Sequence, residues 1–269
     1  MEKTDILEAD PAKFETLVEL IRYLRGPDGC PWDKEQTHLS MRDSMLQECY
    51  EALEAVDENN TAKLCEELGD LLCQIVFQAQ LAAENGDFDI GGVISSITTK
   101  LIRRHPHIFG NTEVENSKEV LANWEKIKRE ERGGNGSSFS SIPGELPALA
   151  FSEEVQERTS RVGFDWSEDS GLLEKIAEEA SEIAMAQGKE EKEDEFGDLL
   201  FALVNFARRQ GVDAESALRK ANRRFTKRFE VMNELAQKAG SKFEDLSAEE
   251  KNTLWEQAKM MLNSRGERI

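Results

Sequence analysis

The chain of 269 residues contains one ordered series of motifs twice. QECYEALEA at 47–55 corresponds to EEASEIAMA at 178–186, and EELGDLLCQIVFQA at 66–79 corresponds to DEFGDLLFALVNFA at 194–207. Further along, NWEKIK at 123–128 corresponds in the same order to a Trp-containing motif near the end of the chain, LWEQAK. Motifs repeated in a constant order with nearly constant spacing indicate a tandem duplication.

A stretch rich in Gly, Ser and Pro, RGGNGSSFSSIPGELP, separates the two copies. Such a composition between two charged helical segments is typical of a linker. We therefore expect an N-terminal unit at 12–131, a linker at 132–147 and a C-terminal unit at 148–263.

Both units have the sequence pattern of α-helices, because no segment sustains strand-like alternation and Ala, Leu, Glu, Lys and Arg dominate. We expect helices near 12–25, 38–57, 61–84, 90–104 and 117–131, and near 170–187, 191–209, 213–238 and 247–263. Asp213 and Ser247 have the sequence context of helix N-caps. Since short connections between amphipathic helices favour a bundle, the predicted fold class is all-α, as tandem duplicated helical bundles.

The charge balance restricts the class of partner. The chain has 34 Lys and Arg against 54 Asp and Glu, a net charge of −20. This opposes binding of long nucleic acids but permits a mononucleotide held by local cations and a metal. The longest apolar stretch is too short to cross a membrane, and the start shows no signal-peptide pattern. Four cysteines without a CxxC pair are typical of reduced thiols, so we expect a cytoplasmic protein.

The second unit places two pairs of carboxylates at helical spacing. Glu179 and Glu182 are three residues apart, as are Glu195 and Asp198 at the start of a strongly apolar helix. Residues three apart share a helix face, so adjacent antiparallel helices would bring all four acids together. A helix that is apolar all round is normally buried, and buried carboxylates need a positive partner. Their oxygen ligands favour Mg²⁺ first and Mn²⁺ second.

The first unit repeats this arrangement with Glu48, Glu51, Glu67 and Asp70. An isolated acidic run is more often a solvated helix face, and that alternative stands for either run taken alone. The combination of two pairs and their repetition favours a metal site. Because Mg²⁺ usually keeps positions open for water and phosphate, such a site predicts a phosphate-bearing substrate.

Several motifs together resemble the MazG family of the all-α nucleoside triphosphate pyrophosphohydrolase superfamily. These are the acidic pairs with GCPWDKEQT (29–37), EELGDLL (66–72), RRHPHIFG (103–110), NWEKIKREER (123–132) and VGFDW (162–166). The resemblance extends over about residues 14–262. It implies Mg²⁺-dependent hydrolysis of nucleoside triphosphates between the α and β phosphates, giving the monophosphate and pyrophosphate. It also implies a homodimer of helical units with sites completed at the interface.

The resemblance also implies roles for individual residues. The metal ligands would be Glu179, Glu182, Glu195 and Asp198, with Glu178 either ligating the metal or orienting the attacking water. Substrate contacts would come from basic residues, one amide and one indole: Lys192, Lys220, Arg228, Asn222 and Trp255, with Lys63, Lys100, Arg104 and Trp124 at the matching positions of the first unit. The alternatives are a solvated face for the lysines and bundle core for Trp255.

The two units are not equivalent. Gln47 stands where the second unit has Glu178, and Ile102 stands where it has Asn222. A glutamine cannot ionise, so it is a poor metal ligand and no base. We therefore predict that the second unit carries most of the turnover. The alternative function is a nucleotide-sensing or protein-interaction module that binds Mg-nucleotide with little turnover, and an acidic helical surface would suit a regulatory protein partner.

Overall fold

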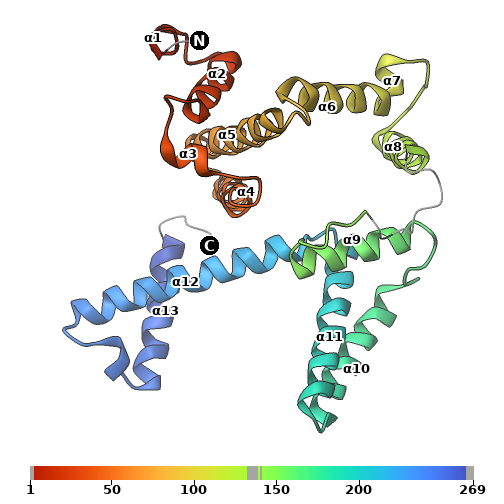
Figure 1. Cartoon of the computed structure of the whole chain (residues 1–269). Helices are drawn as coiled ribbons and strands as arrows, with labels where there is room; N and C mark the ends of the chain where they lie inside the picture. The colour runs from red at the N-terminus through yellow and green to blue at the C-terminus, as the bar shows by residue number, and fades with distance from the viewer. Residues whose placement is uncertain (1–2, 132–138, 140, 265–269) are drawn as a thin grey trace. The chain divides into compact units, whose positions relative to one another are not determined.

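The computed structural model describes residues 3–131, 139 and 141–264. Every regular element of these residues is helical, as Figure 1 shows, so the predicted all-α fold is confirmed. The chain divides into two compact units, 1–134 and 135–269. Half of the expected linker, 132–138 and 140, lies outside the described residues, and the expected unit boundaries stay predictions.

The first unit is built around two long helices, α4 and α5, that pack side by side, with α2 against α5. Its elements are α1 Lys3–Glu8, α2 Phe14–Arg25, α3 Pro31–Glu35, α4 Arg42–Asp57, α5 Thr61–Asn85, α6 Ile90–Arg104, α7 Pro106–Phe109 and α8 Ser117–Glu131. Its core is apolar and buried: Ile21, Met41, Val76, Phe77 and Leu81. The amphipathic pattern of the sequence produces this core, because helix faces with apolar residues at helical spacing meet there.

Local sequence signals set the ends of the helices in the first unit. The side chain of Asn60 accepts a hydrogen bond from the Lys63 amide at the start of α5, and Asp89 does the same for Gly92 at the start of α6. Both satisfy amides that a helix start leaves without an intrahelical partner. Gly86 ends α5 with φ of 78°, a left-handed conformation that glycine adopts without steric cost.

The second unit contains a hairpin of α10 and α11, with α9 packed on α11 and α13 packed on α12. Its elements are α9 Ala148–Ser160, α10 Asp169–Met185, α11 Lys189–Arg209, α12 Ala214–Lys238, η1 Phe243–Asp245 and α13 Ala248–Ser264. The contact between α12 and α13 is made by a buried cluster: Val231, Met232, Ala258 and Leu262. Helix α9 is absent from the helices expected from the sequence, and it supplies part of the pocket described below.

Two of the expected helix starts are confirmed by their hydrogen bonds. Asp213 Oδ1 accepts from the Ser216 amide at 2.9 Å. Ser247 and Glu250 form a reciprocal capping box, in which the Glu250 carboxylate accepts from the Ser247 amide at 2.8 Å and Ser247 Oγ accepts from the Glu250 amide at 3.3 Å.

The expectation that α11 is buried all round is wrong for the single chain. Ala202 and Val204 are buried, but Phe196, Leu200 and Leu203 remain 52%, 49% and 43% exposed. The reason is that α9 and α10 cover only part of the circumference of α11. No described helix is long and apolar enough to cross a membrane. The four cysteines are free thiols.

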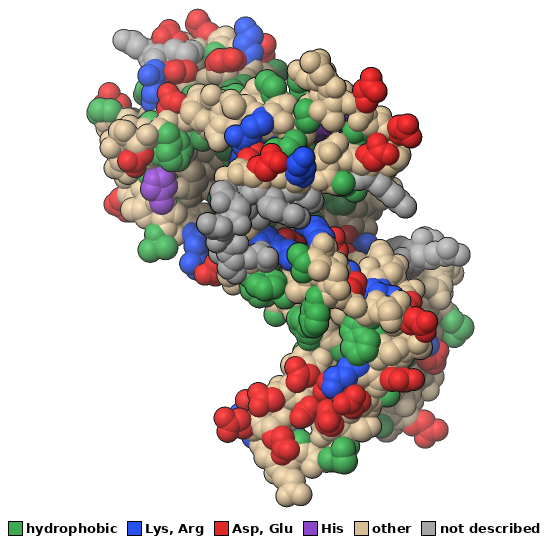
Figure 2. Space-filling model, turned by 90° about the vertical axis from the view of Figure 1, so that its right-hand side faces the viewer, with side chains coloured by type: hydrophobic (Ala, Val, Ile, Leu, Met, Phe, Trp, Pro, Cys, Tyr) green, Lys and Arg blue, Asp and Glu red, His purple; other side chains and the backbone are tan. Residues whose placement is uncertain are grey.

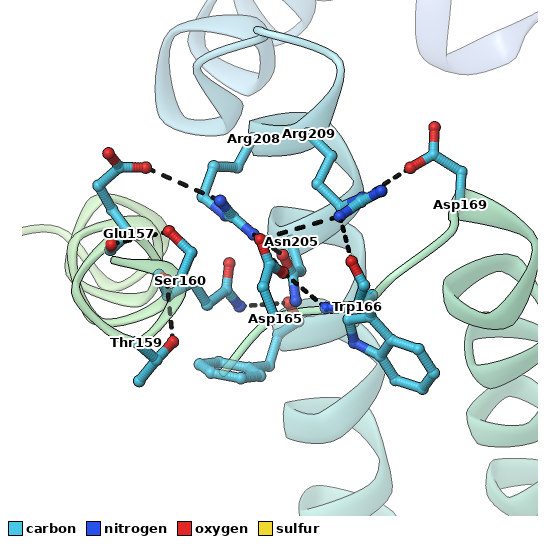
Figure 3. A network of polar contacts seen from close by, with 11 residues as sticks. Glu157, Thr159, Ser160, Asp165, Trp166, Asp169, Asn205, Arg208 and Arg209 are labelled. Atoms are coloured by element: carbon cyan, nitrogen blue, oxygen red, sulfur yellow. Dashed lines mark hydrogen bonds and ion pairs between the residues drawn. The ribbon is translucent and has the colours of Figure 1, made fainter. Parts of the chain in front are cut away.

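A network of arginines and aspartates fixes the loop before α10 against the last turn of α11 (Figure 3). Arg208 Nη2 donates to both carboxylate oxygens of Asp165 at 2.7 Å. Arg209 donates from Nε to Asp169 Oδ1 at 2.6 Å and from Nη1 to the Trp166 carbonyl oxygen at 2.6 Å. These bonds hold the Trp166 loop beside α11, where it forms a wall of the pocket.

Replacing Asp165 by Asn tests the contribution of this network to stability. Burial alone would raise the pKa of Asp165, but hydrogen bonds from Arg208 and from the Trp166 amide give a net lowering. A lowered pKa stabilises the folded state above the ordinary carboxyl pKa of about 3.9, and this stabilisation is lost as pH falls through the folded value. We expect Asp165→Asn to lower Tm at pH 7 by about 2–4 °C.

Thermal melts from pH 7 to pH 3 check this. The difference from the wild type should begin to shrink below about pH 4, where the carboxyl protonates in the unfolded state, and continue to shrink toward the lower pKa of the folded state. Asp245→Asn, at an exposed aspartate of the same unit, is the matched control. A Tm difference that does not depend on pH would contradict the assignment.

Candidate metal centre and adjoining pocket

The α10–α11 hairpin brings acidic side chains from two helices to one place. Glu179 and Glu182 on α10 and Glu195 on α11 each offer a carboxylate oxygen, and these oxygens all lie within 4.8 Å of one another. The spacing of three residues puts both α10 carboxylates on the face that meets α11. In Figure 2 acidic side chains gather over the lower part of the view, where Figure 1 places this hairpin.

Lys175 lies at the edge of this acidic cluster. Glu179 is only 3% exposed. Lys175 Nζ lies 2.7 Å from Glu179 Oε1 and 3.0 Å from Glu178 Oε1. Its hydrogen bond lowers the pKa of Glu179, and in turn Glu179 and Glu178 raise the pKa of Lys175. Lys175 thereby keeps the most buried carboxylate of the group charged.

Glu195 has no such cationic partner among the described residues to offset its negative charge. Burial, and then the charges of Glu182, Glu179 and Asp198, raise the pKa of Glu195. Asp198 is exposed and stands outside the three-residue group, but it is close enough to act on Glu195. The four acids predicted from the sequence therefore lie in one region, with three in mutual contact range and Asp198 beside them.

The first unit forms a corresponding cluster of Glu48, Glu51 and Glu67, whose carboxylate oxygens also lie within 4.8 Å of one another. Burial and neighbouring carboxylates raise the pKa of both Glu48 and Glu67. Asp70 is exposed, as Asp198 is, and its charge contributes to the raised pKa of Glu48.

The two clusters differ in what neutralises them. Gln47 Nε2 donates to Glu51 Oε1 at 2.8 Å, so a neutral amide occupies the position of Glu178. Ser44 stands three residues before Gln47, where the second unit has Lys175 three residues before Glu178. The first cluster thus has neither a carboxylate nor a lysine at these two positions, and a cation that acts on it is Lys63, whose charge lowers the pKa of Glu67 while burial and neighbouring carboxylates raise it.

The basic and aromatic residues expected at the substrate lie on other helices. Lys192 is exposed in the first turn of α11, and Lys220 and Asn222 are exposed on α12. The Arg228 guanidinium lies 5.4 Å from the centroid of the Trp255 ring, and Trp255 packs against the α12–α13 core.

The first unit repeats this stacked pair. The Arg104 guanidinium lies 5.5 Å from the Trp124 centroid. Lys63 Nζ is paired with Glu54 at 2.6 Å, and Lys100 is half-buried on α6. An arginine lies over a tryptophan in both units, but in the register that pairs Ile102 with Asn222, Arg104 corresponds to Arg224 rather than to Arg228.

A pocket of about 710 Å³ adjoins the acidic cluster of the second unit. Lys175, Glu179 and Asp198 contribute its charged side chains, α9 and the loop before α10 contribute further walls, and much of its lining is apolar or aromatic. Among the described residues, the expected contacts Lys192, Lys220, Arg228 and Trp255 are not part of this lining.

Lys175 and Gln156 are among the lining residues that the sequence did not predict as site residues. Lys175 could have been found from its spacing, because i+3 and i+4 positions on a helix are neighbours and these are Glu178 and Glu179. Gln156 carries no such signal, since only the packing of α9 against α11 brings it to the pocket.

Comparison with known proteins agrees with this geometry. The family model described as MazG nucleotide pyrophosphohydrolase domain matches residues 36–109, and the model for phosphoribosyl-ATP pyrophosphohydrolase matches residues 148–225. Each matched segment contains one of the two acidic clusters.

Individual relatives extend the match over nearly the whole chain. The nucleoside triphosphate pyrophosphohydrolase/pyrophosphatase MazG of Thermotoga maritima is 48% identical over 247 residues, covering 91% of this chain and 95% of that protein. The nucleoside triphosphate pyrophosphohydrolase of Escherichia coli K12 is 41% identical over 256 residues, covering 92% and 97%. The crystal structure of a mazG-related protein from Thermotoga maritima is 29% identical, with a TM-score of 0.37, and covers 43% of this chain and 98% of that one. With this identity sustained along the sequence, the chain belongs to the MazG family of nucleotide pyrophosphohydrolases.

Proposed function

We propose that this protein hydrolyses nucleoside triphosphates between the α and β phosphates, with Mg²⁺, chiefly in its second unit. The observation that carries the proposal is the cluster of Glu179, Glu182 and Glu195 at the edge of a pocket of about 710 Å³. The Thermotoga maritima and Escherichia coli relatives are named nucleoside triphosphate pyrophosphohydrolases, which supports the substrate class. The products would be the nucleoside monophosphate and pyrophosphate.

The donor set fits a hard divalent cation. Glu179, Glu182, Glu195 and Asp198 offer only carboxylate oxygens, the ligands that Mg²⁺ and Mn²⁺ prefer. These four residues would hold the ion. Bound Mg²⁺ would polarise phosphate oxygens and offset the charge that develops on the leaving pyrophosphate. Burial, and then the negative charge of the neighbouring carboxylates, raise the pKa of Glu195, and a cation would offset that negative charge.

Two side chains on α10 are placed to assist the reaction. Lys175 lines the pocket and bonds to Glu179, so its ammonium can also donate to a phosphate oxygen of the substrate. Glu178 is exposed next to the cluster, and its carboxylate can accept a hydrogen bond from the attacking water and so orient it. Positioning of this kind, rather than covalent chemistry by the protein, supplies most of the acceleration in phosphoryl transfer.

The assignment of turnover to the second unit rests on the two differences between the clusters. The first unit has Gln47 and Ser44 in place of Glu178 and Lys175. Gln47 can donate to Glu51, as it does in the structure, but it cannot add negative charge to a metal site. Ser44 cannot neutralise a phosphate. The first cluster can still bind a cation, with weaker catalysis.

The exposed face of α11 supports a homodimer. Phe196, Leu200 and Leu203 recur at i, i+4 and i+7 and remain about half exposed, and Leu68 and Leu72 are exposed at the corresponding positions of α5. Burying one such side chain is worth roughly 1.5–3 kcal/mol. Within the described part of one chain, the residues proposed to contact phosphate and base do not line this pocket: Lys192, Lys220, Asn222, Arg228 and Trp255. A second copy of the chain would bring its own set of these residues to the pocket. An acidic surface also leaves room for a regulatory protein partner.

Product analysis tests the reaction directly. With Mg²⁺ and ATP we expect AMP and pyrophosphate in equal amounts, and an excess of EDTA should abolish both because the carboxylates then have no cation to bring to the phosphates. Mn²⁺ should restore turnover after EDTA. Release of ADP and inorganic phosphate would contradict the site of cleavage, and nucleotide binding without turnover would favour the sensing function.

A matched pair of isosteric substitutions tests which unit is active. We expect Glu182→Gln to lower kcat/KM for pyrophosphate release by roughly 100-fold or more, since it removes a proposed ligand of the metal. Glu51→Gln changes the corresponding residue of the first unit. It should lower kcat/KM by less than about 3-fold, because the first unit is proposed to contribute little of the turnover. Comparable losses in the two variants would refute the assignment to the second unit.

Light scattering after size exclusion tests the dimer. The wild type should elute with twice the mass of one chain, and Leu200→Glu should shift it to the monomer because a charge would be placed in the apolar interface. Leu39→Glu, at another exposed leucine, is the control and should remain dimeric. A wild type that is monomeric at micromolar concentrations would overturn the proposal.

A further inference from the structure

Gln156 on α9 is the buried amide of the second-unit pocket. It is 3% exposed. Its Nε2 donates to the Phe201 carbonyl oxygen at 2.8 Å. This bond fixes the orientation of the amide, because the reverse orientation would place two acceptor oxygens against each other. Oε1 therefore faces elsewhere, and among the described residues it has no hydrogen-bond partner.

Other polar groups of this pocket are already engaged, as Figure 3 shows for several of them. Asp165 accepts from Arg208 and from the Trp166 amide. Asn205 Oδ1 accepts from Arg208 at 2.7 Å, and Thr159 Oγ1 donates to the backbone of Gln156. A buried acceptor without a partner is uncommon in native proteins, so Gln156 Oε1 calls for a donor, and Gln156 is one of the residues that line the pocket.

The pocket has the dimensions and walls that a nucleoside needs. Asp198, Phe201 and Asn205 line it from successive turns of α11, a span of about 10 Å along the helix axis. The acidic cluster lies at the Asp198 end. Phe164 and Trp166 also line the pocket and remain 78% and 40% exposed, so their rings can stack on a base.

We propose that Gln156 determines base recognition, by accepting a hydrogen bond from an N–H group on the Watson–Crick edge of the substrate base. This inference rests on the proposed function, because phosphates held at the carboxylates point the base toward Phe201 and Gln156. The Watson–Crick edge lies opposite the glycosidic bond and is the edge that proteins read when a base enters a pocket. Each common base carries an N–H there, so the pocket accepts several bases and rejects those without this donor.

Paired nucleotides that differ by this one group test the proposal. We would measure Kd by calorimetry and kcat/KM by pyrophosphate release for ATP against purine riboside triphosphate, which lacks the 6-amino group, and for UTP against 3-methyl-UTP. We expect the analogues to be disfavoured by roughly 10-fold, because they leave the buried oxygen unsatisfied. Gln156→Met, similar in size but without the acceptor, should bring both ratios close to one.

The matched control is Gln74→Met in the first unit. Gln74 Oε1 is also buried without a partner among the described residues, and this variant should keep the wild-type ratios. Equal affinity of the wild type for natural and modified nucleotides would overturn the proposal, as would unchanged ratios in Gln156→Met, since a water molecule would then satisfy Oε1. The wild-type comparison decides the matter even if Gln156→Met does not fold.

The two affinity ratios are independent of turnover. Absence of pyrophosphate release with the ratios intact would reject the proposed function and keep the role of Gln156. Normal release with ratios of one would reject only the role of Gln156.

Discussion

Repulsion among Glu179, Glu182 and Glu195 is the constraint around which the second unit is arranged. Three carboxylates whose oxygens lie within 4.8 Å of one another would not be held together by their own interactions. Packing of α10 along α11 imposes this proximity, and Lys175 neutralises the most buried member. The surplus charge on the remaining acids is what makes the cluster suited to a divalent cation.

The two units place different residues beside the same kind of acidic helical hairpin. Both units keep three converging glutamates and an arginine stacked on a tryptophan. Two of the differences between the units lie beside the cluster and set its charge, with Gln47 and Ser44 in one unit and Glu178 and Lys175 in the other. Each half therefore has a hairpin of two packed helices that brings three glutamates together, while the residues that set the charge beside these glutamates differ.

The pocket depends on contacts remote from the acidic cluster. The bonds of Arg208 and Arg209 to Asp165, Trp166 and Asp169 hold the loop before α10 against α11. Helix α9 completes the enclosure through the bond of Gln156 to the Phe201 carbonyl. The residues proposed for base recognition and for phosphate chemistry thus lie at opposite ends of one short segment of α11, since Asp198 and Phe201 are one turn apart.

The sequence by itself determined the helical fold, the duplication, the helix starts at Asp213 and Ser247, and the acids that meet at each hairpin. These follow from local rules, because spacing of three or four residues fixes which side chains share a helix face. Tertiary structure alone decided that α9 covers α11, that Gln156 reaches the pocket, and that Phe196, Leu200 and Leu203 stay exposed. The physical reason is that periodicity shows which face of a helix is apolar, whereas the neighbour that covers this face depends on contacts between residues far apart in the chain.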